Sequence, residues 1–128
     1  MCRRGFSDTQ EVLKNIQDEN LRAYIIWLPI LRSDDRPSAV KRSGEYYDKR
    51  LSYFWDGKQI TGRTWQRVLD IPRIAWDIYF LYDSNVRWAK EPSQPNFWMH
   101  QLGGVSEGKR LDAKEFELKV KELLGKIE

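Results

Sequence analysis

Apolar residues recur at two different spacings in the first part of the chain. Between Phe6 and Ile16 they return every three or four positions, which predicts a helix over Ser7–Asn20. Leu21–Leu31 is instead a nearly continuous apolar run rich in β-branched and aromatic residues. Such a run is typical of a strand buried on both faces of a parallel sheet. Pro29 marks the end of this strand, because proline cannot donate a hydrogen bond to a central ladder.

The middle of the chain repeats this alternation of helical and extended patterns. Asp35 followed by Pro37 has the chemistry of a helix start, which predicts a helix to about Asp48. Leu51–Trp55 is a short apolar stretch that predicts a strand, and a turn follows it. Ile60–Leu69 carries its apolar residues at the spacing of an amphipathic helix.

The last part of the chain predicts two or three further strands and a final helix. Ile74–Tyr82 is the second long strand candidate, and Val86–Trp88 is expected to return beside it as a hairpin. Asn96–Leu102 is a third strand or extended segment. Asp112 is the expected cap of a helix that runs to about Lys126.

The order of these elements predicts the fold class. Helical sequence separates the two long strands, Leu21–Leu31 and Ile74–Tyr82, so we expect a parallel crossover between them. The return after Tyr82 adds an antiparallel pair. We therefore expect an α/β fold with a mixed sheet flanked by helices. The 128 residues contain no internal repeat or linker, which predicts a single domain over 1–128.

Composition narrows the classes of protein to which the chain can belong. Lys and Arg number 22 against 19 Asp and Glu, and the two signs are interleaved, which argues against a nucleic-acid partner. No apolar run approaches the ~18 residues of a membrane span, so no membrane partner is expected. One cysteine cannot form an internal disulfide, which excludes a disulfide-stapled secreted module and makes the cytoplasm the expected location.

The single cysteine is the main candidate for chemistry. Cys2 lies close to the start of the first predicted helix, whose dipole and free amide groups would stabilise a thiolate. Arg3 and Arg4 add positive charge. A single thiol can form a mixed disulfide but cannot complete an internal thiol–disulfide cycle. The sequence leaves two interpretations open, a redox thiol and an exposed cysteine without a role.

The element order, with Cys2 just ahead of the first helix, resembles the thioredoxin-like fold. Four segments carry a closer resemblance, to uncharacterised bacterial thioredoxin-like proteins with an N-terminal Cys-x-x-Cys motif or its selenocysteine equivalent: Trp27–Leu31, Tyr53–Gly57, Ala75–Asp83 and Asn96–Gly104. The resemblance implies that the fold's first strand and the attacking residue would precede Met1. Cys2 would then be the second, resolving cysteine of the motif. The chain would be naturally shortened, or its start misplaced, as when a selenocysteine codon is read as a stop.

The resemblance also implies a function and a substrate-binding proline. The function is that of a thiol- or selenol-disulfide oxidoreductase acting on a protein disulfide or a small thiol. The Ile71–Pro72 pair is the only candidate for the family's cis-proline beside the thiol, although the residues themselves favour Pro72 as a plain helix stop. Without the first strand, an open sheet edge is expected to pair with another copy as a homodimer. The alternative function is a non-catalytic binding domain of the same fold, with an aromatic surface for a protein partner.

Other chemistry finds little support in the sequence. The sole histidine, His100, is far from Cys2 in the chain, so no metal-ligand spacing exists, and no glycine pattern typical of a phosphate loop occurs. We therefore expect neither a metal nor a cofactor. Asp77 lies within a predicted strand, where it either faces a functional cleft or pairs with Arg63 or Arg73.

Overall fold

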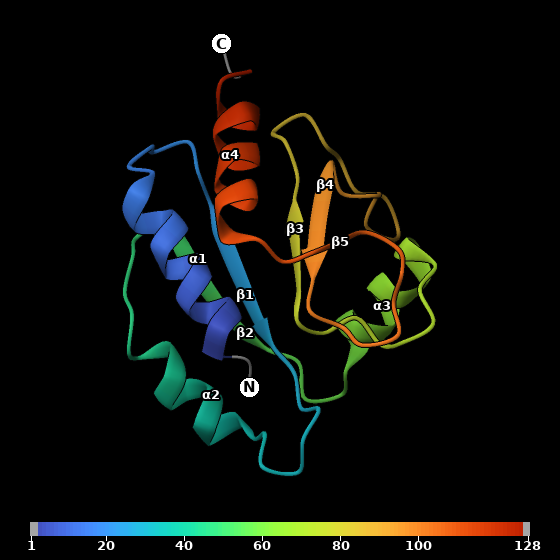
Figure 1. Cartoon of the computed structure of the whole chain (residues 1–128). Coiled ribbons are helices and arrows are strands. Elements are labelled where there is room, and N and C mark those ends of the chain that lie inside the picture. Colours follow the sequence, from blue (N-terminus) through green and yellow to red (C-terminus); the bar gives the residue numbers. More distant parts are fainter. Residues whose placement is uncertain (1–2, 127–128) are drawn as a thin grey trace. The chain divides into compact units, whose positions relative to one another are not determined.

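A computed structural model describes residues 3–126 of the chain (Figure 1). The chain divides into two compact units, Met1–Ile60 and Thr61–Glu128. The described residues form four helices and two small sheets, so the predicted α/β class is confirmed. The expectation of one mixed sheet is not met, because the hydrogen-bonded strands of residues 3–126 fall into a pair and a group of three. The single domain over 1–128 stays a prediction.

The first unit contains a pair of parallel strands. In the sequence, one helix precedes the first strand and another connects the two strands. Helix α1 is Arg3–Asn15, strand β1 is Ala23–Trp27, helix α2 is Arg36–Ser43 and strand β2 is Leu51–Trp55. The strands pair in parallel from Ala23 opposite Leu51 to Trp27 opposite Trp55. The parallel crossover therefore exists, but it joins β1 to the short strand β2.

Alternation along the strands explains how the first unit forms its core. Successive side chains of a strand point to opposite faces. Ile25, Trp27, Tyr53 and Trp55 share the face that packs with Phe6 of α1 and Ala39 of α2. The other face carries Tyr24 and Phe54, which are 65% and 52% exposed. The prediction that both faces of β1 are buried is therefore wrong, since one face is open.

The second unit has an antiparallel centre and its own core. Helix α3 is Ile60–Leu69, strands β3, β4 and β5 are Ile78–Leu81, Phe97–His100 and Lys109–Arg110, and helix α4 is Ala113–Leu124. Strand β4 pairs antiparallel with β3 and parallel with β5. The buried residues of its core come from α3 and from the segments that follow α3 and β4: Trp65, Leu69, Ile71, Ala75, Leu102 and Val105.

Two strand predictions for this unit need correction. Strand β3 begins at Ile78, four residues later than predicted, because Asp77 has a left-handed backbone with φ 54° that interrupts an extended strand. Its antiparallel partner is β4, and Val86–Trp88 forms no strand. None of the helices within residues 3–126 combines the length and the apolar character needed to cross a membrane.

Candidate functional site

The direction of α1 decides where its N-terminal end lies in the first unit. Near that end, Phe6 packs edge-on against Trp27, the last residue of β1, with ring centroids 5.4 Å apart. Near the other end, the carbonyl oxygen of Leu13 accepts a hydrogen bond from Arg50, which directly precedes β2. Helix α1 therefore runs opposite to the two parallel strands and begins at their carboxyl edge, as Figure 1 shows. Ligands of α/β proteins bind at this edge.

The loops that follow β1 and β2 are tied together at the same edge. The Asp56 amide donates to the Trp27 carbonyl oxygen at 2.7 Å. The Gln59 side chain donates to the Pro29 carbonyl oxygen at 2.5 Å, and Gln59 itself has a left-handed φ of 58°. The Asp56 carboxylate accepts the Ile60 amide at 3.0 Å, which caps the first turn of α3. These contacts hold the two loops in a fixed shape.

An apolar segment lies in the first of these loops. Leu28, Pro29 and Ile30 are partly buried, and Leu31 is 59% exposed. The Asp34 carboxylate accepts the amides of Ile30 and Leu31 at 3.1 and 2.8 Å, so the segment is ordered although it is apolar. The carboxyl edge thus presents an ordered and partly exposed apolar segment, of a kind that an extended peptide can contact.

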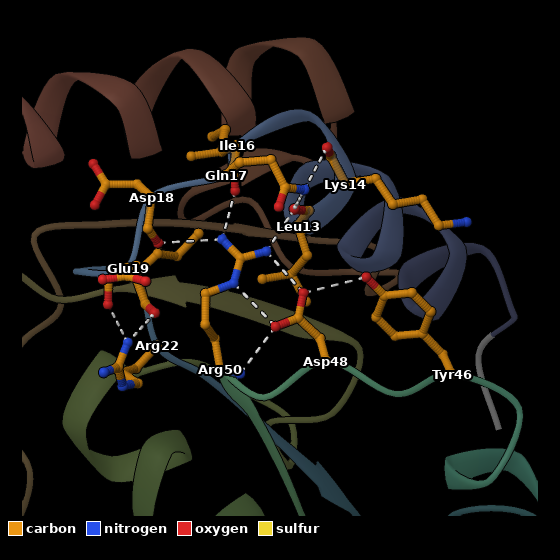
Figure 2. A network of polar contacts seen from close by, with 11 residues as sticks. Leu13, Lys14, Ile16, Gln17, Asp18, Glu19, Arg22, Tyr46, Asp48 and Arg50 are labelled. Carbon is orange, nitrogen blue, oxygen red and sulfur yellow. Dashed lines mark hydrogen bonds and ion pairs between the residues drawn. The ribbon is translucent and has the colours of Figure 1, made fainter.

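A buried ion pair fixes the other end of α1 (Figure 2). The Arg50 side chain is 6% exposed and donates to the carbonyl oxygens of Leu13, Ile16 and Asp18. These carbonyls lie at or just beyond the C-terminal end of α1, where helix carbonyls lack intrahelical partners. Asp48 accepts from Arg50 at 2.8 and 3.0 Å and is steadied by Tyr46 at 3.5 Å. The hydrogen bonds from Arg50 lower the pKa of Asp48 to about 2.

Sequence reasoning missed the contacts of Arg50 with the end of α1, because they are long-range. The carbonyl groups that Arg50 satisfies lie 32 to 37 residues earlier in the chain. No local spacing rule connects positions so far apart. The only local signal is Asp48 two residues before Arg50, where the Asp48 carboxylate also accepts the Arg50 amide at 2.9 Å.

The described start of α1 bears on the thiol hypothesis through its charges. No acidic residue lies in its first turn, but Asp8 one turn later is ion-paired with Arg4 at 3.7 Å and offsets its charge, so the helix dipole is the main feature there that favours a thiolate. Cys2 directly precedes the first described residue of α1 and lies outside the described residues itself. Its role as a redox thiol stays a prediction.

The other two predicted site residues, Ile71 and Pro72, lie in the second unit. Ile71 is 5% exposed and belongs to the core of the second unit, where its amide donates to the Gln66 carbonyl oxygen at 3.2 Å. Pro72 is exposed, and its peptide bond is trans, like every other peptide bond of residues 3–126. Pro72 follows the end of α3 closely, as a helix stop does. Cys2 and Pro72 belong to different units, and a shared substrate site stays a prediction.

Asp77 has partners other than the arginines expected from the sequence. Its carboxylate accepts hydrogen bonds from the Tyr79 hydroxyl and from the Gln101 side chain, the latter at 2.9 Å. Arg73 donates instead to the Gly103 carbonyl oxygen at 2.8 Å. The group around Asp77 therefore links the start of β3 to the residue after β4.

Neither the described residues nor the comparisons with known proteins indicate a ligand. Within residues 3–126, no three His, Cys, Asp or Glu side chains are grouped so that they could hold a metal ion. Strand residue His100 is 1% exposed, and its ring is hydrogen-bonded to backbone groups of Leu102 and Glu107. No family model matches the chain, and no curated protein or solved structure matches it either. The candidate site therefore rests on the residues of this chain alone.

Proposed function

We propose that the chain is a thioredoxin-like domain of the thiol-disulfide oxidoreductase class in which Cys2 is the redox thiol. The observation that carries the proposal is the orientation of α1. The helix begins at the carboxyl edge of the parallel strands β1 and β2, and Cys2 immediately precedes it in the sequence. A helix N-terminus stabilises a thiolate, and a thiolate is the nucleophile of disulfide exchange.

The exchange step follows from the chemistry of one thiolate. The Cys2 sulfur attacks one sulfur of a partner disulfide, the partner's S–S bond breaks, and its other sulfur leaves as a thiolate. Cys2 is then held in a mixed disulfide. A small thiol attacks the partner's sulfur in that mixed disulfide, releases Cys2 as a thiolate and becomes disulfide-bonded to the partner in its place. In the complete motif that the sequence resembles, Cys2 would instead resolve a mixed disulfide formed by an upstream cysteine or selenocysteine.

The substrate class is a protein disulfide in an extended segment. The ordered apolar segment 28–31 lies at the same edge and offers Leu31, 59% exposed, for contact with such a segment. Peptides that bind in extended form gain affinity from backbone contacts and specificity from side-chain contacts of this kind.

Capture of a disulfide tests the proposed function. The reduced chain is mixed with a symmetric dimer of two identical peptides joined by one disulfide, and the intact mass is measured over time. We expect a mass increase equal to one half of the peptide disulfide, reversed by a small thiol and absent in Cys2→Ser. A chain that stays unmodified while a free cysteine peptide reacts under the same conditions would overturn the proposal.

A second candidate is a binding domain without catalysis, which pairs with another copy of itself. The observation in its favour is the open face of the first unit. Within the described residues, β1 and β2 have only each other as hydrogen-bonded strand neighbours. Tyr24 and Phe54 lie together on the exposed face, with ring centroids 6.3 Å apart. Strands with open edges pair readily with other chains unless charge or proline blocks them.

Charged substitutions on that face separate this candidate from the first. We expect sedimentation of the unaltered chain to show a dimer that grows with concentration, and Tyr24→Lys with Phe54→Lys to abolish it. Tyr47→Lys is the matched control, because Tyr47 is 87% exposed and lies outside both strands. A monomer at every concentration contradicts pairing and leaves disulfide capture by Cys2 unaffected.

A further inference from the structure

His100 is the only histidine of the chain, and its ring is held by backbone groups on both sides. The ring is 1% exposed, on strand β4. Its Nδ1 atom accepts the Leu102 amide at 3.0 Å, so Nδ1 carries no proton and the imidazole is neutral. The backbone of Glu107 forms a second hydrogen bond with the ring. Since Nδ1 is an acceptor, this second bond is donated by Nε2 to the Glu107 carbonyl oxygen.

These two bonds involve Leu102 and Glu107, which lie near the two ends of the segment that connects β4 to β5, residues 101–108. Leu102 and Val105 anchor the segment in the core, and the Leu111 amide donates to the His100 carbonyl oxygen at 2.8 Å. Arg110 closes the segment on itself by donating to the Leu102 carbonyl oxygen at 2.5 Å. The His100 ring and the Arg110 side chain thus both connect the start of the segment to residues near its far end.

The groups that face His100 make its protonation costly in the closed form. Burial lowers the pKa of His100, and the positive charge of Arg110 on β5 lowers it further. The Glu107 carbonyl and the negative charges of Asp77 and Glu107 act in the opposite direction and are smaller effects. Protonation also removes the lone pair that accepts the Leu102 amide, so the charged ring and the closed segment are incompatible.

We propose that His100 is a proton-sensitive latch, and that protonation of its Nδ1 atom breaks the bond to the Leu102 amide and loosens residues 101–108, which connect β4 to β5. The proposal concerns the second unit alone and does not depend on the redox chemistry of Cys2. The loosened form would expose Leu102 and Val105, which are 1% and 9% exposed in the closed form.

Two measurements on the unaltered chain test the latch. Because the chain has one histidine, proton NMR follows its ring without assignment, and we expect it to titrate below the ordinary value of 6.5. Amide exchange is measured across the same pH range and corrected for the intrinsic pH dependence of exchange. Protection of the Leu102 amide should fall about tenfold for each pH unit between 6.5 and the titration midpoint of the native ring.

Control amides and a variant distinguish a local latch from general loss of stability. The amides of Ala23 and Asp56 in the first unit are hydrogen-bonded and should keep their protection over this range. His100→Asn keeps an acceptor near the position of Nδ1 but does not titrate, so its Leu102 protection should no longer follow pH. A ring that titrates at 6.5 or above overturns the proposal, as does Leu102 protection that stays constant with pH. Both of these readings need only the unaltered chain, so the test does not rely on the variant folding.

Discussion

One buried arginine, Arg50, makes two kinds of contact in the first unit. Arg50 neutralises Asp48 and also satisfies carbonyl oxygens at the end of α1 (Figure 2). Burying a charge is costly unless it is paired and hydrogen-bonded. Here the guanidinium meets both conditions, since the carboxylate supplies the charge and the carbonyl groups accept its remaining protons. The Asp48–Arg50 pair therefore stabilises the first unit, and this stabilisation depends on pH.

Asp48 should give the first unit stability that is lost in acid. Its pKa is lowered from 3.8 to about 2 by the hydrogen bonds from Arg50. A lowered pKa means that the unfolded state takes up the proton first, so this stability is present above pH 3.8 and is lost as pH falls toward 2. In Asp48→Asn we expect a loss of about 2 kcal/mol at neutral pH, measured by urea unfolding.

The same urea unfolding measurements, repeated at low pH, provide the control for this prediction. Below the native pKa of Asp48 the unaltered chain and Asp48→Asn should approach equal stability, because the carboxyl group is then protonated in both states. A constant difference between them from neutral to acid pH would mean that Asp48 is not the group responsible.

At the scale of elements, α1 is the part on which the proposed site depends most. Phe6 holds one end of the helix on the strands and Arg50 holds the other. A helix of 13 residues is marginal on its own in water, so these tertiary contacts supply much of its stability. Both contacts set the position of the N-terminal end of α1.

Removal of Arg50 should therefore destabilise the first unit strongly. Arg50→Met removes the guanidinium that bonds the Asp48 carboxylate and the α1 carbonyls, which costs about 3–5 kcal/mol for a buried pair. Lys49→Met is the matched control, because Lys49 is 73% exposed and its ion pair with Glu19 is on the surface. Urea unfolding followed by far-UV circular dichroism should rank the unaltered chain and Lys49→Met together, with Arg50→Lys below them and Arg50→Met lowest. Equal stability of Arg50→Met and Lys49→Met would contradict this.

Elements with strong local signals could be predicted from the sequence. The bounds of β2 and α3 agree with the predicted ranges Leu51–Trp55 and Ile60–Leu69. The caps of α2 and α4 also agree, since the Asp35 carboxylate accepts the Ser38 amide and Asp112 accepts the amides of the first turn of α4. Helix α1 instead starts at Arg3 and ends at Asn15, earlier at both ends than predicted.

Predictions from the sequence failed where contacts with distant residues determine the local structure. An apolar run such as Ile74–Tyr82 does not reveal that Asp77 takes a left-handed backbone, because Asp77 is held there by the Gln101 side chain from beyond β4. The choice of β4 over Val86–Trp88 as the partner of β3 is likewise a long-range pairing. Of the candidate site, the sequence predicted a helix that follows Cys2 and starts at Ser7, whereas the structure starts it at Arg3. Its placement at the carboxyl edge depends on Arg50 and Phe6, which no spacing rule links.

At the scale of the whole molecule, each unit has its own core and its own proposed behaviour. The first unit carries the start of α1, the apolar segment 28–31 and the open face of Tyr24 and Phe54. The second carries His100 and the segment it closes. Redox chemistry, self-association and the response to pH are therefore separable, and each has variants that leave the other two intact.

The central claim is that Cys2 is an activated thiol, and titration of that thiol tests it most directly. Because the chain has one cysteine, the ultraviolet absorbance of its thiolate can be followed against pH, with Cys2→Ser as the blank. An unperturbed cysteine titrates at about 8.5, and a helix N-terminus lowers this midpoint. We predict a midpoint below that of the same chain unfolded in urea. A native midpoint equal to the unfolded one, or above it, would contradict the account.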